Sequence, residues 1–250
     1  MCYGIFLHIY LFGVLWMIKK VLIMNFAVIV LLGILTLTIS NTVTVLTESK
    51  PIVRHHCIVI DPGHGGVDGG ATSVHGKLES QLNLEISLRL RDLCHLLGIN
   101  TVMIRTDDRS IHSSGQSIAQ KKISDLKNRV QIVNGIDKSI LVSIHQNYFT
   151  NGKYHGAQVF YANDPESKDL AIAMQTSLVT NLNPESNRKA KKASGIYLME
   201  HIKRPGILIE CGFLSNDNEA KRLTSDVYQK KICIVIASVL STYINEVRIS

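Results

Sequence analysis

The cysteines of this 250-residue chain form no C-x-x-C pair, which excludes a zinc ribbon and a thioredoxin-type redox motif. Four of the five, namely Cys57, Cys94, Cys211 and Cys233, lie inside apolar runs, where a free thiol behaves as a small hydrophobic side chain. We therefore expect these thiols to pack in a protein core. Disulfides are the alternative if the protein is exported.

Charged residues are nearly absent from the first 40 positions, where only Lys19 and Lys20 occur. Residues 21–40 form an uncharged run that is long enough to cross a bilayer as a helix, and a lysine pair before such a run is typical of a cytoplasmic flank. The run is longer than the roughly 7–15 apolar residues of a secretory signal, and no Ala-x-Ala cleavage site follows it. We predict an uncleaved membrane anchor, with a cleaved signal as the alternative. The rest of the chain is exported in either case.

The composition excludes a disordered or collagen-like protein, because 46% of the residues are hydrophobic and 19% are charged. Beyond the first 40 positions there is no internal repeat and no sign of a second domain, and a net charge of +5 remains once the two early lysines are set aside. The 210 residues beyond position 40 correspond to about one large domain. We divide the chain into an anchor or signal with its flank (1–43) and one folded domain (44–250). Its basic excess suits an anionic polymer or lipid headgroups as surroundings.

Short β-branched runs alternate with longer amphipathic stretches. The runs predict strands at 57–61, 101–105, 139–144, 157–161 and 206–210, with a weaker one at 196–199, and the stretches predict helices at 79–97, 123–135, 166–182 and 226–246. This alternation indicates an α/β fold, a single domain with a twisted, mostly parallel sheet flanked by helices. Two irregular stretches, 106–122 and 183–195, are expected to be functional or mobile loops.

Ionisable residues follow three of the predicted strands, and a carboxylate begins the first predicted helix. His64, His145 and Glu210 come at strand ends, and the carboxyl ends of parallel strands share the sheet edge where ligands bind in open α/β folds. Glu79 lies where the positive end of the helix dipole favours an ionised carboxylate. Two histidines and one glutamate are a ligand set used by catalytic zinc. The residues therefore indicate a metal site at this edge.

Each of these residues also has an ordinary structural interpretation. His64 fits a turn histidine in a glycine-rich loop, His145 fits a core histidine at a strand end, and Glu79 fits a simple first-turn charge. Their separations exclude an H-E-x-x-H helix. Glu210 is harder to explain structurally, because a carboxylate after Gly-Ile-Leu-Ile is nearly buried and needs a partner.

Four segments, in chain order, resemble the signatures of the zinc-dependent N-acetylmuramoyl-L-alanine amidases of the amidase-3 family. They are Ile-Asp-Pro-Gly-His-Gly-Gly at 60–66, Leu-Glu at 78–79, Ser-Ile-His-Gln-Asn at 143–147 and Ile-Glu-Cys-Gly-Phe-Leu-Ser-Asn at 209–216. The resemblance extends from about 57 to 245. Residues 118–134 and 194–199 are most similar to the germination-specific, spore-cortex (CwlD-type) subgroup.

The resemblance implies one Zn²⁺ per chain, held by His64, Glu79 and His145, with Glu210 as the catalytic carboxylate. The implied reaction is hydrolysis of the amide bond between N-acetylmuramic acid and L-alanine in peptidoglycan. In the subgroup this reaction precedes muramic-δ-lactam formation in the spore cortex and serves germination. The sequence departs from the usual family pattern at Ser80, Tyr148 and Cys211, none of which is a ligand position, so the departures concern fine specificity.

The expected partners are the peptidoglycan glycan strand with its stem peptide, the membrane through residues 21–40, and an activating lipoprotein that the subgroup implies. We place the lipoprotein contact at 106–122. The expected location is the forespore or cortex compartment of a spore-forming bacterium. Nucleic acid is not expected as a partner, because the basic run at 188–192 contains no aromatic residue.

Two other functions remain as alternatives. A zinc carboxypeptidase uses the same ligand types but needs an arginine for the terminal carboxylate of its substrate, for which Arg105 and Arg129 are candidates. A catalytically idle cell-wall-binding protein would keep the fold without turnover, although an intact Glu210 beside three ligand residues disfavours it.

Overall fold

The computed structural model describes residue 16, residues 19–20, 22–26 and 28–31, and residues 57–247. The chain separates into two compact units, Met1–Val53 and Arg54–Ser250. In the first unit the described residues are helical, and those at 22–26 and 28–31 belong to a short apolar helix, Leu22–Leu31. The rest of the predicted anchor at 21–40, and the predicted boundary between 43 and 44, lie outside the described residues.

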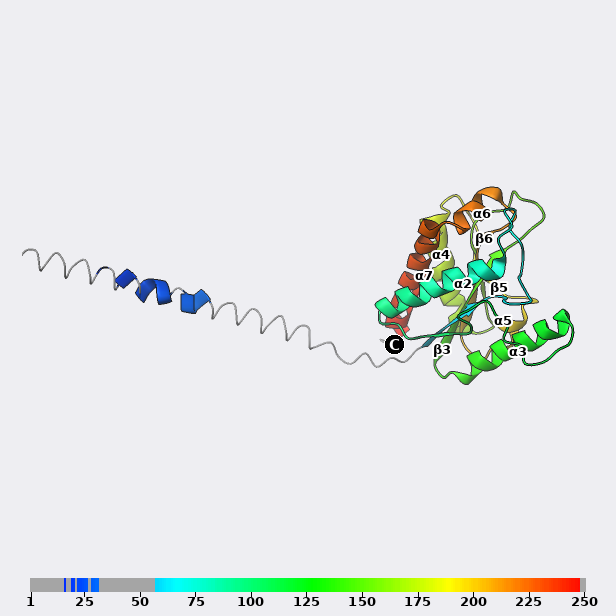
Figure 1. Cartoon of the computed structure of the whole chain (residues 1–250), viewed down its shortest axis with the longest axis horizontal. Coiled ribbons are helices and arrows are strands. Elements are labelled where there is room, and N and C mark those ends of the chain that lie inside the picture. Colours follow the sequence, from blue (N-terminus) through cyan, green and yellow to red (C-terminus); the bar gives the residue numbers. More distant parts are fainter. Residues whose placement is uncertain (1–15, 17–18, 21, 27, 32–56, 248–250) are drawn as a thin grey trace, which may run out of the picture. The chain divides into compact units, whose positions relative to one another are not determined.

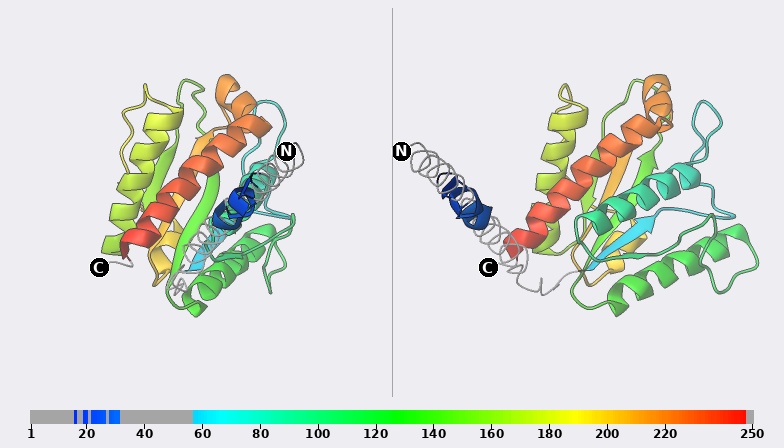
Figure 2. Two further views of the ribbon diagram at one scale, coloured as in Figure 1. Left: turned by 90° about the vertical axis from the view of Figure 1, so that its left-hand side faces the viewer. Right: turned by 60° about the vertical axis from the view of Figure 1, so that its left-hand side comes forward.

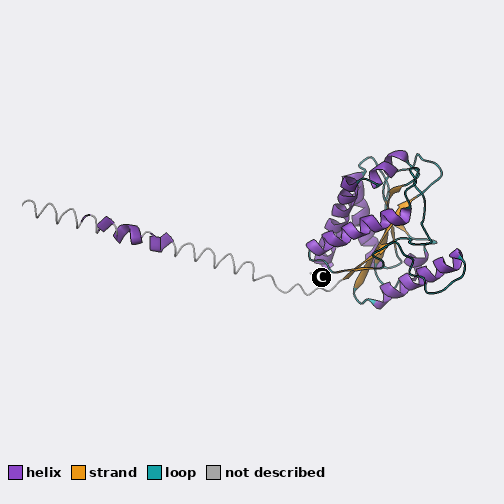
Figure 3. Cartoon of the chain, in the orientation of Figure 1, coloured by secondary structure: helices purple, strands orange, loops and turns teal. Residues whose placement is uncertain are grey.

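A six-stranded sheet forms the centre of the second unit (Figure 1, Figure 3). Its strands are β1 (Cys57–Pro62), β2 (Thr101–Met103), β3 (Ser139–Asn147), β4 (Gln158–Tyr161), β5 (Lys191–Lys192) and β6 (Gly206–Phe213). The order across the sheet is β2-β1-β3-β6-β4-β5. The first four strands in this order run parallel, whereas β4 runs antiparallel to β6. The predicted α/β fold with a mostly parallel sheet is confirmed.

Helices cover both faces of the sheet (Figure 2). They are α2 (Glu79–Leu96), α3 (Ile118–Gly135), α4 (Pro165–Leu182), α5 (Tyr197–His201), α6 (Asp217–Leu223) and α7 (Asp226–Val247). One hydrophobic core joins α2, α4 and α7 to the sheet, and a smaller core joins α3 and α5 to its other face. Helix α7 is apolar and long enough to span a membrane. It packs against α2 and α4, which accounts for its apolar composition.

Several predicted boundaries need correction. Helix α3 begins five residues before the predicted start at 123, because Ser117 and Gln120 form a capping box that starts the helix at Ile118. The weak strand predicted at 196–199 is wrong. That segment enters helix α5, whose start is closed by a hydrogen bond from the Gly195 N–H to Glu200. Helix α6 was not predicted, since its seven residues are too few to show a helical pattern.

The irregular stretch predicted at 106–122 is shorter than expected and is anchored to the rest of the domain. Residues 118–122 are helical, and the preceding residues are tied to α3. The Ser110 hydroxyl and the Ile111 N–H both donate to Asp125, at 2.8 and 2.7 Å. The backbone N–H groups of Ser113 and Ser114 donate to the hydroxyl of Ser124.

The cysteines of the described residues are all free thiols. Cys94, Cys211 and Cys233 are buried in the larger core, and Cys57 is partly buried. The prediction of core packing is confirmed for these three. Disulfides are absent from the part of the chain that the structure describes.

Candidate active site

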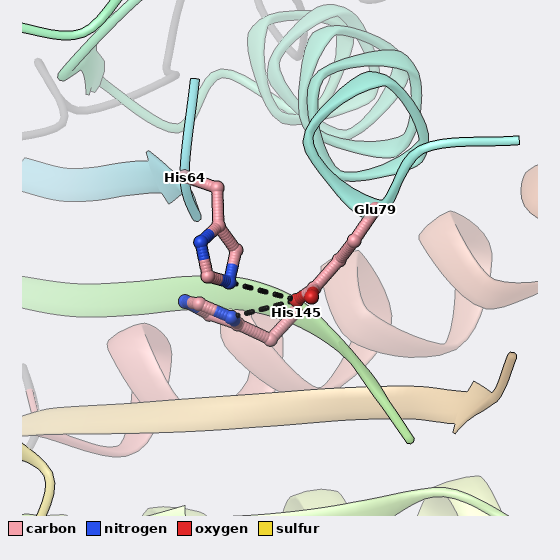
Figure 4. Close-up of side chains that lie close together, drawn as sticks. All are labelled: His64, Glu79 and His145. Atoms are coloured by element: carbon pink, nitrogen blue, oxygen red, sulfur yellow. Dashed lines mark hydrogen bonds and ion pairs between the residues drawn. The ribbon is translucent and has the colours of Figure 1, made fainter. Parts of the chain in front are cut away.

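His64, Glu79 and His145 converge at the carboxyl edge of the sheet (Figure 4). His64 follows β1, Glu79 is the first residue of α2, and His145 lies in β3. One carboxylate oxygen of Glu79 lies 3.3 Å from Nε2 of His64 and 3.0 Å from Nδ1 of His145. One ligand atom from each residue lies within 4.8 Å of the others. The structure thus brings together all three residues that were predicted as ligands.

The Glu79 carboxylate is almost fully buried, with 4% of the residue exposed. Backbone N–H groups of Ala71 and Gln146 donate to its two oxygens, at 2.9 and 3.1 Å. Burial alone raises the pKa of this carboxyl, but the two histidines outweigh it and hold the pKa well below its usual range. Glu79 therefore stays ionised, which is the form in which a carboxylate binds a metal ion.

His64 is held from the side opposite to Glu79. Its backbone is left-handed, with φ of 60°, and its Nδ1 lies 2.9 Å from a carboxylate oxygen of Asp68. This contact leaves Nε2 directed at Glu79. Burial lowers the pKa of His64, but hydrogen bonds to Asp68 and Glu79 raise it to about 9. A metal ion bound at Nε2 would displace the proton that these carboxylates favour.

Arg105 joins the loop that carries His64 to the helix that carries Glu79. The side chain is buried and donates to the carbonyls of Pro62, Gly63 and Ser80, each at 2.9 Å. Because these carbonyls belong to β1, its following loop and the first turn of α2, one guanidinium fixes both segments. This role depends on contacts between residues far apart in the chain, so no sequence pattern predicts it.

Arg129 holds the same loop from α3. It donates to the carbonyl of His64 at 2.8 Å and forms ion pairs with Asp61 and Asp125. Arg105 and Arg129 are both almost fully buried. Neither is available to bind the terminal carboxylate of a substrate, so their suggested carboxypeptidase role is wrong.

Glu210 lies in β6 beside this cluster, directly in register with His145. One carboxylate oxygen is buried and has no hydrogen-bond partner among the described residues. Burial is the main cause that raises the pKa of Glu210 to about 7, and the nearby Glu79 carboxylate adds to this effect. The next residue, Cys211, is buried in the core shared with α2, α4 and α7, as the alternation of side chains along a strand predicts.

A cavity of about 220 Å³ opens beside the two histidines. Its walls come from α3, which contributes Lys122 and Leu126, and from the start of α5, which contributes Tyr197. The cavity gives a substrate access to the convergent polar groups.

Comparisons with known proteins agree with this architecture. Residues 58–242 match the amidase-3 family, described as N-acetylmuramoyl-L-alanine amidase. A germination-specific N-acetylmuramoyl-L-alanine amidase of Bacillus subtilis is 40% identical over 192 residues, which cover 76% of this chain and 80% of the relative.

Solved structures show the same relationship. The CwlD amidase of Clostridioides difficile, solved in complex with the GerS lipoprotein, is 38% identical with a TM-score of 0.73, and the match covers 76% of this chain and 98% of that one. An N-acetylmuramoyl-L-alanine amidase of Clostridium difficile 630 is 30% identical with a TM-score of 0.64, covering 77% and 98%. The chain therefore belongs to the amidase-3 family and is an N-acetylmuramoyl-L-alanine amidase.

Proposed function

We propose that this amidase is zinc-dependent and that His64, Glu79 and His145 bind one Zn²⁺ per chain. The convergence of these three side chains is the observation that carries the proposal. Two imidazole nitrogens and one carboxylate oxygen match the donor set of catalytic zinc sites, and Asp68 supports His64 as outer carboxylates support metal-binding histidines. Bound zinc supplies Lewis acidity, which polarises the scissile carbonyl and makes water a better nucleophile.

Glu210 acts as the proton carrier in this proposal. Its pKa of about 7 allows it to accept a proton from water and to return that proton to the departing amine. Glu79 is unsuited to this role, because both histidines and two backbone N–H groups already stabilise its ionised form. The two carboxylates thus divide the ligand and base functions.

The cellular role that we propose is removal of stem peptides in the spore cortex before muramic-δ-lactam forms. The similarity to a germination-specific amidase supports it. Residues 118–134 and 194–199, which carry the subgroup resemblance, belong to α3 and to the start of α5, and both elements line the cavity at the site. We further propose that the enzyme is exported and that residues 21–40 tether it to the membrane.

An activating lipoprotein is proposed as a partner, because a structural relative was solved in complex with one. The candidate contact is the segment 106–122. Lys122, at the end of this segment, lies 3.1 Å from Asp68, the residue that orients His64. A lipoprotein bound at this segment would therefore act close to a proposed metal ligand.

Metal analysis of the purified full-length chain in detergent, with and without a lipoprotein of this class, tests the proposal. Digestion of cortex peptidoglycan is followed in parallel by mass spectrometry. We expect zinc at one ion per chain and release of intact peptides that begin with L-alanine. Release of single C-terminal amino acids would indicate a carboxypeptidase, and binding without products would indicate an idle wall-binding protein.

A further inference from the structure

A second, larger concavity lies at the end of the sheet formed by β4 and β5, away from β1. Two loops border it. Its volume is about 590 Å³. Its walls are residues 153–155, which precede β4, Gln158 at the start of β4, and residues 185–189 and 191, which lead into β5. We call this concavity the basic groove. It shares no lining residue with the cavity beside His64 and His145.

The basic groove is lined by more basic than acidic side chains. Lys153, Arg188, Lys189 and Lys191 line it, and none of them forms an ion pair with any described residue. Glu185 is the one carboxylate in the wall, and it lies 4.0 Å from His155. An excess of unpaired cations in a concave surface attracts anionic ligands.

Arg188 is held in a fixed orientation within the groove. Its Nε donates to the carbonyl of His155 at 2.9 Å, and its Nη1 donates to the side-chain oxygen of Gln158 at 3.4 Å. The guanidinium carbon lies 4.9 Å from the centre of the Phe213 ring. A guanidinium that is positioned in advance and lacks a carboxylate partner is suited to bidentate recognition of a carboxylate.

The groove adjoins the reaction site through the sheet. Gln158, in its wall, is the direct register partner of Glu210, and neighbouring strands lie about 4.8 Å apart. Phe213, beneath Arg188, lies three residues beyond Glu210 in the same strand, which corresponds to about 10 Å. An extended peptide advances about 3.5 Å per residue. A chain leaving the site would thus reach the groove about two to four residues after the scissile amide.

We propose that the basic groove binds the carboxylates of the stem peptide, on the alanine side of the scissile amide. This inference rests on the proposed function and specifies which part of the substrate is recognised. The glycan strand is a poorer match, because the carboxyl group of each peptide-bearing muramic acid is consumed in the amide bond. The peptide carries free carboxylates, which complement Arg188 and the lysines.

Synthetic muramoyl-L-alanine peptides test the proposal, using the zinc-loaded full-length chain in detergent. Peptides of one to four residues are prepared, each with all carboxyl groups free or all converted to carboxamides, and kcat/KM is measured for every pair. We expect the wild type to prefer the free acid by about tenfold at three or four residues, the equivalent of about 1.4 kcal/mol. The preference for the free acid should be smaller for peptides of one residue, and it should weaken with added salt.

In the triple variant K153Q/K189Q/K191Q, the ratio of kcat/KM for the free acid to kcat/KM for the carboxamide should be close to one. No hydrogen bond or ion pair of these three side chains occurs in the described structure, and all three residues are exposed, so the variant should fold. Lys231→Gln, an exposed lysine of α7, is the matched control and should keep the wild-type ratio. Arg188→Gln should lower the ratio, with Arg188→Lys intermediate.

Calorimetric titration with the free tripeptide and tetrapeptide acids and their carboxamides separates this inference from the proposed function. Tighter binding of the acids, lost in the triple variant, supports the groove even if no substrate is cleaved. Equal binding of acids and carboxamides would overturn it. A dependence of kcat/KM on glycan length, lost in the triple variant, would assign the groove to the sugar strand and would also overturn it.

Discussion

His145 and Glu210 are register partners on neighbouring parallel strands, so their side chains project from the same face of the sheet. Their environments differ sharply. His145 contacts the ionised Glu79 carboxylate at 3.0 Å, whereas one oxygen of Glu210 has no partner among the described residues. A buried carboxylate without a hydrogen bond is costly to ionise, which is why its pKa rises. This pairing places a carboxyl group of near-neutral pKa beside the proposed ligands.

Replacing Glu210 with glutamine should therefore lower kcat by about 10²–10⁴-fold while zinc stays bound, because the variant keeps the shape and removes the base. In the wild type, kcat/KM should fall as the pH drops below about 7, where Glu210 takes up a proton. Cleavage assays and metal analysis on the same samples measure both effects. Zinc loss in this variant would mean that Glu210 is a ligand.

Replacement of His64, Glu79 or His145 with alanine should reduce zinc occupancy and abolish cleavage. The three side chains converge within 4.8 Å, so each removal leaves two of the three protein donors. Glu85→Gln removes the α2 member of a half-buried ion pair with Lys77; it is the control and should keep its zinc. Full metal content and activity in His64→Ala would show that the site is assigned wrongly.

Asp68→Asn should weaken zinc binding by about 10–100-fold without removing a ligand, because Asp68 orients the His64 ring. The measurement is competition with a fluorescent chelator, accompanied by thermal unfolding of the metal-free protein. Asp107→Asn, in an exposed pair with Arg109, is the matched control. If both variants bind zinc as the wild type does, Asp68 has no positioning role.

The sequence could predict the convergence of His64, His145 and Glu210, because strand ends in a parallel sheet share one edge. It could not predict the clamp made by Arg105, since that residue contacts Gly63 and Ser80 only after the chain folds. Helix α5 was missed for a related reason. Leu198 and Met199 pack against the second core, and that tertiary contact outweighs the strand propensity of neighbouring residues.

The buried thiols Cys94 and Cys233 should resist alkylation in the native protein. Burial raises the pKa of each thiol to about 12, so the reactive thiolate is scarce even at pH 9. Maleimide labelling followed by peptide mapping should show slow modification of both residues, and rapid modification in urea. Labelling that is equally fast in native and unfolded protein would contradict their place in the core.

The buried pair of Asp61 and Arg129 should make stability depend on acid pH. Burial raises the pKa of Asp61, but Arg129 and the Ser143 hydroxyl outweigh it and lower the pKa below 3.8. Because the unfolded chain then takes up a proton that the folded chain does not, the stabilisation is complete above about pH 4. It is lost as the pH falls from there through the folded pKa.

Asp61→Asn should accordingly lower the free energy of unfolding by about 3 kcal/mol at pH 7, the usual cost of removing one partner of a buried ion pair. The difference from the wild type should shrink as the pH falls below 4. Urea unfolding at pH 7, 5 and 3.5 measures it. Asp137→Asn removes the exposed partner of Arg204 and should cost less than about 1 kcal/mol. If the two variants lose the same free energy of unfolding, the buried pair of Asp61 and Arg129 stabilises the protein no more than a surface ion pair does. The anchoring of the His64 loop by Arg129 would then contribute nothing measurable.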